Sequence, residues 1–146
     1  MSTSRETVRD GLVALLAPAL VGEGLPVKTV TGSKVLDMTG QILVMVLSKG
    51  SSRPAGTAMG NFADFALEIY VFVPQSGTDW TATQAEDTLD AIEALIAGVI
   101  EDNRRTDLWG YLMYDGDSRV GETDPALEGT PYYIEVIPIM IKIFQS

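Results

Sequence analysis

Five carboxylates gather in the C-terminal third of this sequence, in the segment DGDSRVGETDPALEG. They are Asp115, Asp117, Glu122, Asp124 and Glu128. Carboxylate oxygens on a glycine-containing loop are the ligands that a hard cation such as Ca²⁺ prefers. The spacing does not match an EF-hand loop, because Arg119 stands where a third oxygen ligand belongs and the closing acid comes too early. We therefore interpret the segment as a solvated acidic loop and assign it no metal ion.

A second candidate is the run KGSS, Lys49 to Ser52, which looks like the end of a phosphate-binding loop. Such a loop needs an upstream glycine and a following helix, so that backbone amides converge on the phosphate. Both are missing here, and the run predicts no phosphate site. Arg53, Arg104 and Arg105 supply further local positive charge. We expect them to pair with acids within the fold or across an interface.

The chain has no cysteine and no histidine. These residues supply the thiolate nucleophile, the commonest general base and the commonest zinc ligands, so serine and cysteine hydrolases of the usual kind, zinc fingers and zinc hydrolases are excluded. A small-ligand-binding protein or an enzyme that works with two carboxylates in a cleft stays open as an alternative. The sequence singles out no such pair. We therefore predict no catalytic residue, no cofactor and no metal site, and expect that the protein is not an enzyme.

The formal net charge is −10, from 10 Lys and Arg residues against 20 Asp and Glu residues. Binding to a phosphate backbone needs clustered Lys and Arg, so this charge argues against nucleic-acid binding. It suits a surface that repels DNA, or simply an acidic protein that stays soluble when concentrated. The apolar stretches are too short and interrupted to span a bilayer, and the N-terminal segment is polar. We expect a soluble, unexported protein that does not interact with membranes.

Two helices are predicted to position these side chains. From Thr81 to Glu101, apolar residues recur at gaps of three and four, with acids mainly off that stripe. Two capping boxes could begin this helix, Thr81 with Gln84 or Thr83 with Glu86. A shorter amphipathic helix is predicted from Ser4 to Ala17. Thr3 and Glu6 have capping-box spacing at its start, and the helix is expected to end at Pro18 or shortly after.

Strands are predicted where apolar residues alternate or run continuously. The predicted ranges are Val27 to Thr31, Gln41 to Ser48, Phe62 to Val73, Trp109 to Met113 and Thr130 to Phe144. Pro138 cannot donate a ladder hydrogen bond, so the last strand is expected at a sheet edge or with a bulge there. The resulting order, α-β-β-β-α-β-β, predicts one domain over residues 1–146. We expect an α+β fold in which two helices pack on one face of a mostly antiparallel sheet of four to five strands.

The small and polar segment KGSSRPAGTAMGN, Lys49 to Asn61, separates the second and third predicted strands. It can contribute little to a core, so an exposed and mobile loop is predicted.

Taken together, the pattern resembles the tail terminator proteins of long-tailed bacteriophages, also called tail completion or minor tail proteins. The features that carry the resemblance are the opening helix SRETVRDGLVALLAP, the strand FADFALEIYVFVP, the helix containing AEDTLDAIEALI, and the closing run GTPYYIEVIPIMIKI. The likeness covers roughly residues 4 to 144 and is one of size, pattern and order.

The resemblance implies a structural role. Such proteins form rings, commonly hexamers, that cap the tail tube, end its polymerisation and present a surface to the head connector protein. The implied partners are further copies of the chain, the tail tube protein and the connector, with DNA passing through the ring without specific binding. The implied location is the head-proximal end of the tail in the virion, after synthesis in the host cytoplasm. A head–tail connector or another minor tail component looks much the same at this level.

On this interpretation the loop from Lys49 to Asn61 is a candidate partner-contact loop, suited to becoming ordered on a partner. Its candidate contact residues are Lys49, Ser51, Ser52, Arg53, Met59 and Asn61. Whether the acidic loop faces the channel or the outside of a ring is left open.

Overall fold

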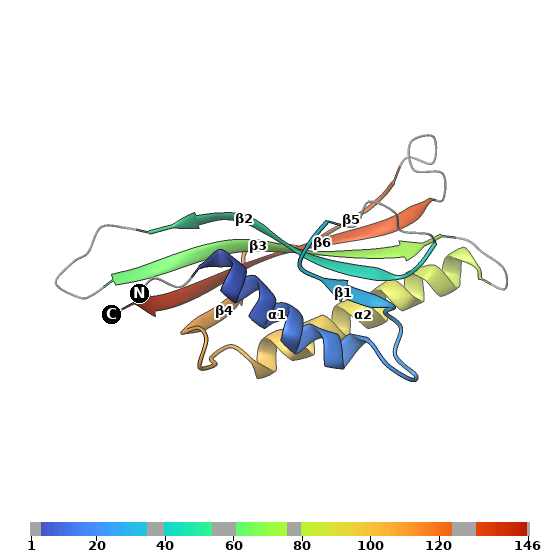
Figure 1. The fold of residues 1–146 in the computed structure, drawn as a ribbon. Coiled ribbons are helices and arrows are strands. Elements are labelled where there is room, and N and C mark those ends of the chain that lie inside the picture. The colour runs from blue at the N-terminus through green and yellow to red at the C-terminus, as the bar shows by residue number, and fades with distance from the viewer. Residues whose placement is uncertain (1–3, 35–39, 54–60, 76–79, 124–130, 146) are drawn as a thin grey trace.

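The computed structural model describes residues 4–34, 40–53, 61–75, 80–123 and 131–145. In chain order the elements are α1 (Arg5–Leu20), β1 (Thr29–Thr31), β2 (Leu43–Ser52), β3 (Asn61–Pro74), α2 (Ala82–Asp102), β4 (Tyr111–Tyr114), β5 (Arg119–Glu122) and β6 (Tyr132–Gln145). Both helices lie on the same face of one sheet (Figure 1). The predicted α+β class is confirmed.

The sheet has the order β1-β2-β3-β6-β4, and β5 pairs with β6 beside β4. β1 runs parallel to β2, and the other neighbouring pairs are antiparallel. β3 and β6 are paired along their whole length, from Asn61 opposite Gln145 to Pro74 opposite Tyr132. The six strands exceed the predicted four to five, because β5 lies within the segment interpreted as an acidic loop. All four β5 residues are exposed, so its sequence carries no alternating apolar signal.

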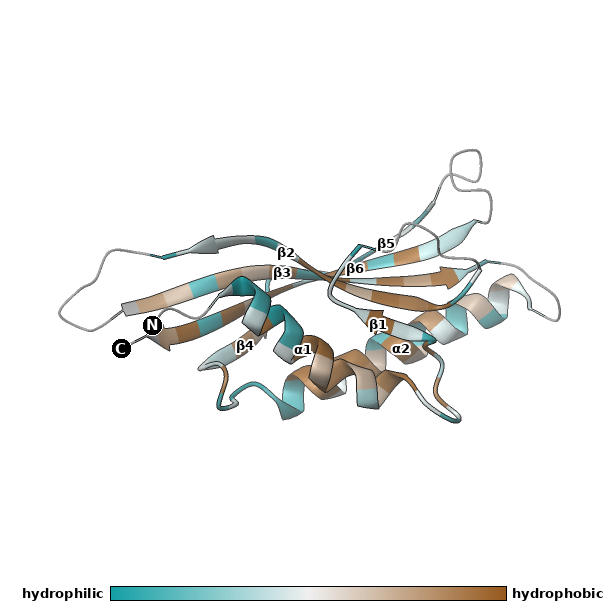
Figure 2. Cartoon of the chain, in the orientation of Figure 1, coloured by the Kyte–Doolittle hydropathy of each residue, from teal (hydrophilic) through white to brown (hydrophobic). Residues whose placement is uncertain are grey.

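The core lies between the helices and one face of the sheet. From β3 it takes alternate residues from Phe65 to Val73, and from β6 it takes Ile137, Ile139, Ile141 and Ile143. The helices add the apolar stripes that the spacing predicts, including Ala85, Leu89, Ile92, Ile96 and Val99 of α2. Figure 2 shows hydrophobic and hydrophilic segments alternating along both helices. Alternation along the strands and helical spacing therefore identified the inner face correctly.

The residues that cap the two helices can be identified from their hydrogen bonds. α2 begins with the Thr81 and Gln84 box: the Thr81 amide donates to Gln84 Oε1 at 2.8 Å, and the Gln84 amide donates to Thr81 Oγ1 at 3.2 Å. α1 is capped by Ser4 instead of Thr3, since the Thr7 amide donates to Ser4 Oγ at 3.1 Å. Thr3 itself lies outside the described residues.

Pro18 lies inside the last turn of α1, and the helix ends shortly after it, as the sequence predicts. The helix continues to Leu20, and the Val21 amide still donates to the Ala17 carbonyl at 2.9 Å. Pro18 and Ala14 are both exposed, so water can satisfy the carbonyl that proline leaves without a donor. Burial of Leu20 holds the last turn on the sheet.

β6 is not an edge strand, which corrects the prediction from Pro138. It lies between β3 on one side and β4 and β5 on the other. The Pro138 carbonyl accepts a hydrogen bond from the Asp115 amide at 2.9 Å, so the missing N–H points toward the same side. On that side β4 has ended at Tyr114 and β5 begins only at Arg119. Proline is tolerated because the neighbouring strand is interrupted there.

Candidate functional site

The predicted partner-contact loop starts later than the sequence suggested. Lys49, Ser51 and Ser52 belong to β2, which continues past a bulge between Ser48 and Gly50 and stays paired with β3. Backbone pairing needs no apolar side chains, which explains why the polar run KGSS forms strand. Asn61 is the first residue of β3, and Met59 lies outside the described residues.

The end of the sheet beside this connection carries aromatic rings and cations, and we call it the aromatic end: Arg53, Phe62, Phe65, Lys142 and Phe144. The Arg53 guanidinium lies 5.0 Å from the centroid of Phe65, and Lys142 Nζ lies 5.2 Å from that of Phe62. Lys142 Nζ is also 3.8 Å from a carboxylate oxygen of Asp64. Phe144 is 73% exposed, more than any other large apolar residue in the described part of the chain. This combination suits contact with another macromolecule better than binding of a small molecule.

The helix-free face of the sheet has its own small apolar cluster and a charged network. Leu43, Met45, Phe72 and Tyr132 are buried there. Farther along the same face, Glu68 Oε1 accepts a hydrogen bond from the Tyr70 hydroxyl at 2.7 Å and lies 3.4 Å from Lys49 Nζ. The hydrogen bond to Glu68, together with burial, raises the pKa of Tyr70, and nearby Arg119 partly opposes this rise. Glu68 is therefore paired and hydrogen-bonded within the subunit.

Of the five carboxylates of the predicted acidic loop, the structure describes Asp115, Asp117 and Glu122. Asp115 and Asp117 are exposed between β4 and β5, and Glu122 belongs to β5. Asp124 and Glu128 lie outside the described residues. Within the described part of the chain, no three acidic side chains approach closely enough to hold a metal ion.

A buried carboxylate that the sequence analysis did not single out lies on the helix-covered face. Glu135 of β6 is 5% exposed, and the Ser118 hydroxyl donates to its Oε2 at 2.7 Å. Burial raises the pKa of Glu135, and the negative charges of Glu93 and Asp90 on α2 add to the rise, whereas the Ser118 hydrogen bond opposes it. The signal was available, because Glu135 occupies an inward position in the alternation of β6.

Two tyrosines extend this acidic environment along the sheet. The Tyr133 hydroxyl donates to Glu86 Oε1 at 3.5 Å, and the pKa of Tyr133 is raised by desolvation and by Glu86 and Glu122. Burial and the charges of Glu93 and Glu101 raise the pKa of Tyr114. One flank of α2 therefore carries carboxylates above β6 and the short strands. We call this surface the acidic strip: Glu86, Asp90, Glu93, Tyr114, Val120, Glu122, Tyr133 and Glu135.

A hollow of about 680 Å³ lies where the end of α1 meets the start of β2. Its described lining residues include Val27, Ile42, Pro74 and Trp80, with Lys28 as the single charged one and no carboxylate. The Trp80 indole N–H donates to the Pro74 carbonyl at 2.6 Å. The hollow is mainly apolar and brings no pair of acids together.

Comparison with known proteins gives a limited picture. No protein-family model matches the chain. No curated protein matches it in sequence. Among solved structures, the chain is similar to the sheath/tube terminator of an extracellular contractile injection system (PVC) in its extended state, with a TM-score of 0.49 and 11% identity. That similarity covers 100% of this chain and 58% of the terminator chain. Neither helix is long and apolar enough to cross a membrane.

Proposed function

We propose that this protein is a structural tail component that forms a ring, caps a tail tube, ends its polymerisation and offers a surface to the head connector, without catalytic activity. The proposal starts from the resemblance in pattern and order to phage tail terminators. The structural observation that supports it best is the aromatic end. There β2, β3 and β6 run beyond the helices (Figure 1) and carry the 73% exposed Phe144, with Lys142 over Phe62 and Arg53 over Phe65 at the same end of the sheet. We propose that this end contacts the tail tube protein.

The overall charge supports the same function. A ring of subunits that each carry −10 would present negative charge to DNA in its channel. Screening limits this repulsion to about 8 Å at physiological ionic strength, which is still relevant in a narrow bore. DNA would therefore pass without specific binding.

Oligomeric state is the first test. The purified protein should form hexameric rings, alone or after addition of its cognate tail tube protein, as measured by light scattering and negative-stain microscopy. Single subunits under both conditions would contradict the proposal.

The aromatic end provides a second test. Phe144→Ser should weaken the contact with the tube and yield overlong tails, since polymerisation is no longer stopped. Leu25→Ser is a matched control, because Leu25 is also an exposed apolar residue, at 37%, and lies away from this end. Tails of normal length that cannot join heads would indicate a head–tail connector instead.

A further inference from the structure

The part of the inner sheet face nearest β5 is left uncovered by the helices. Val120 of β5 is 63% exposed and Tyr114 of β4 is 39% exposed. Val120 pairs with Glu135 and Tyr114 pairs with Ile139, so both side chains share the face on which α2 lies. Exposed apolar residues on an edge strand are a common feature of surfaces that a partner covers. This surface is the acidic strip defined above.

The carboxylates of the strip have no cation within ion-pair distance in the described part of the chain. The ion pairs there use Asp10, Asp64 and Glu68. Around Glu135 the neighbouring charges are Asp90 and Glu93, which are of the same sign. The exposed Arg119 of β5 influences Tyr70 on the other face of the sheet. Arg104 is a cation that acts on the strip, since its charge lowers the pKa of Tyr114 against the burial and the charges of Glu93 and Glu101 that raise it. In the described part of the chain the strip is therefore a partly apolar surface on which carboxylates outnumber cations, and a cationic partner fits it.

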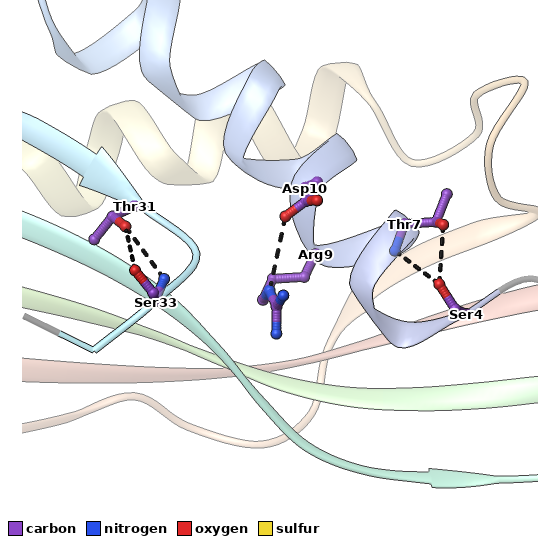
Figure 3. Close-up of polar contacts among 6 residues, drawn as sticks. All are labelled: Ser4, Thr7, Arg9, Asp10, Thr31 and Ser33. Atoms are coloured by element: carbon purple, nitrogen blue, oxygen red, sulfur yellow. Dashed lines mark hydrogen bonds and ion pairs between the residues drawn. The ribbon is translucent and has the colours of Figure 1, made fainter.

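The opposite edge of the same sheet has the complementary charge. Residues 4–34 contain four Lys or Arg residues against three Asp or Glu residues, whereas residues 80–123 contain three against ten. We call the four cations the basic edge: Arg5, Arg9, Lys28 and Lys34. Lys28 and Lys34 are exposed on either side of β1. Arg9 projects from α1 beside the end of β1, as Figure 3 shows, and its side chain is 27% exposed.

The geometry of the sheet decides what kind of contact these surfaces can make. β1 is one edge of the sheet, and β4 and β5 form the other. Because the two surfaces lie at opposite edges, they cannot meet within one subunit. When one copy docks its basic edge on the acidic strip of the next, the first copy still has a free strip and the second a free basic edge. Such heterologous contacts continue until a ring closes.

We propose that the acidic strip binds the basic edge of a second copy of this chain, and that this head-to-tail contact builds the ring. The inference rests on the proposed function, because it names the surfaces that hold the ring together. Tyr114 and Val120 supply the apolar part of the contact, and the charges fix its direction. Since exposed charge pairs are screened by salt, association should weaken as ionic strength rises.

A charge-swap experiment tests the contact. Glu86→Lys with Asp90→Lys reverses the strip, and Lys28→Glu with Lys34→Glu reverses the basic edge. Each double variant places like charges opposite one another, so the dissociation constant between subunits should rise by about tenfold or more. The chain with all four substitutions restores both the net charge and the complementarity, and rings should return. Circular dichroism checks that each variant is folded.

Asp87→Lys with Asp102→Lys is the matched control. Both residues are exposed on α2, outside the strip, and the change in net charge is the same. This variant should form rings like the wild type. Rings that form equally well in every variant would overturn the head-to-tail contact and leave the proposed function intact, as would a strip variant that keeps its rings and loses only the tail tube. Absence of rings from the wild type, with and without tube, would overturn the proposed function itself.

Discussion

Two glutamates are buried on opposite faces of the same sheet, and their surroundings differ. Glu68, 8% exposed on the helix-free face, lies between the Lys49 ammonium and the Tyr70 hydroxyl. Glu135, 5% exposed on the helix-covered face, has the Ser118 hydroxyl as its hydrogen-bond donor and two carboxylates as its charged neighbours. A buried charge is tolerated when it is paired and hydrogen-bonded. Glu68 meets both conditions within the subunit, and Glu135 meets only the second.

The difference shows on which face of the sheet the charged side chains find partners within the same chain. On the helix-free face, Lys49 with Glu68 and Lys142 with Asp64 balance charge locally. On the helix-covered face, the carboxylates of the acidic strip have no ion pair among the described residues. A surface that keeps unpaired acids beside exposed Val120 is better explained by a partner than by solvent alone. The contrast between the two glutamates therefore supports an inter-subunit contact at the acidic strip.

The largest expected effect is a loss of stability that differs between substitutions on the two faces of the sheet. Ile139→Ala should lower the free energy of unfolding by about 2–5 kcal/mol, because the side chain is fully buried under the helices and leaves a cavity. Met140→Ala, one residue away on the helix-free face, should cost clearly less, since Met140 is only partly buried. Urea denaturation measures both values. Equal losses would mean that the two faces contribute alike to stability.

A smaller effect tests the charge of Glu135. Glu135→Gln should raise the free energy of unfolding at neutral pH by about 1 kcal/mol, the scale of one buried polar interaction. The pKa of Glu135 in the native state is raised above its ordinary value of 4.5. At pH values between 4.5 and the native pKa, the carboxyl group is therefore protonated in the native state and ionised in the unfolded state. Wild-type stability should therefore fall as pH rises through that window, and the variant should lack this fall.

The control for Glu135 is Glu122→Gln on neighbouring β5. Glu122 is exposed, so its substitution should change stability by no more than about 0.5 kcal/mol. Urea denaturation at several pH values, on single subunits, gives both comparisons. A loss of stability in the Glu135 variant would show that its negative charge is favourable in the folded subunit.

The smallest effect concerns Glu68. Glu68→Gln should lower the pKa of Tyr70 toward its ordinary value of 10.0, because the hydrogen bond to the carboxylate is the main cause of the rise. Titration followed by tyrosinate absorbance detects the change, and Tyr70→Phe identifies which tyrosine it belongs to. The change in stability should stay within about 1 kcal/mol, since Lys49 is 56% exposed and its ion pair is screened. An unchanged titration would show that the Glu68 carboxylate does not control Tyr70.

Much of the fold was predictable from local pattern, and the failures have identifiable causes. The inward faces of α2, β3 and β6 followed from spacing, because one side of each is mainly apolar, with Glu135 as the exception in β6. β5 was missed because all four of its residues are exposed. β2 was drawn too short because KGSS is held by backbone pairing with β3, which polar residues also allow. Pro138 was taken to indicate an edge strand or a bulge, although an interrupted neighbouring strand accommodates it inside the sheet.

The candidate surfaces were less predictable than the fold. The predicted partner-contact residues begin at Lys49, but the exposed phenylalanine that marks the aromatic end comes from β6, more than eighty residues later in the chain. Acidic residues that are close in the sequence, such as Asp115 and Asp117, are exposed to solvent in the structure. Those that share a surface, such as Asp90 and Glu135, are far apart in sequence.

The sequence by itself determined which side of each helix and strand faces the core, because apolar spacing acts within a few residues. It also determined the net charge of −10 and the absence of cysteine and histidine chemistry. Only the tertiary structure decided which charges meet. β6 passes between β3 and the two short strands and beneath α2, and this arrangement places Glu135 beside Asp90 and Glu93, while Glu68 on β3 receives Lys49 from β2. Electrostatic interactions depend on distance in space, so a sequence that states the number of charges leaves their pairing to the fold.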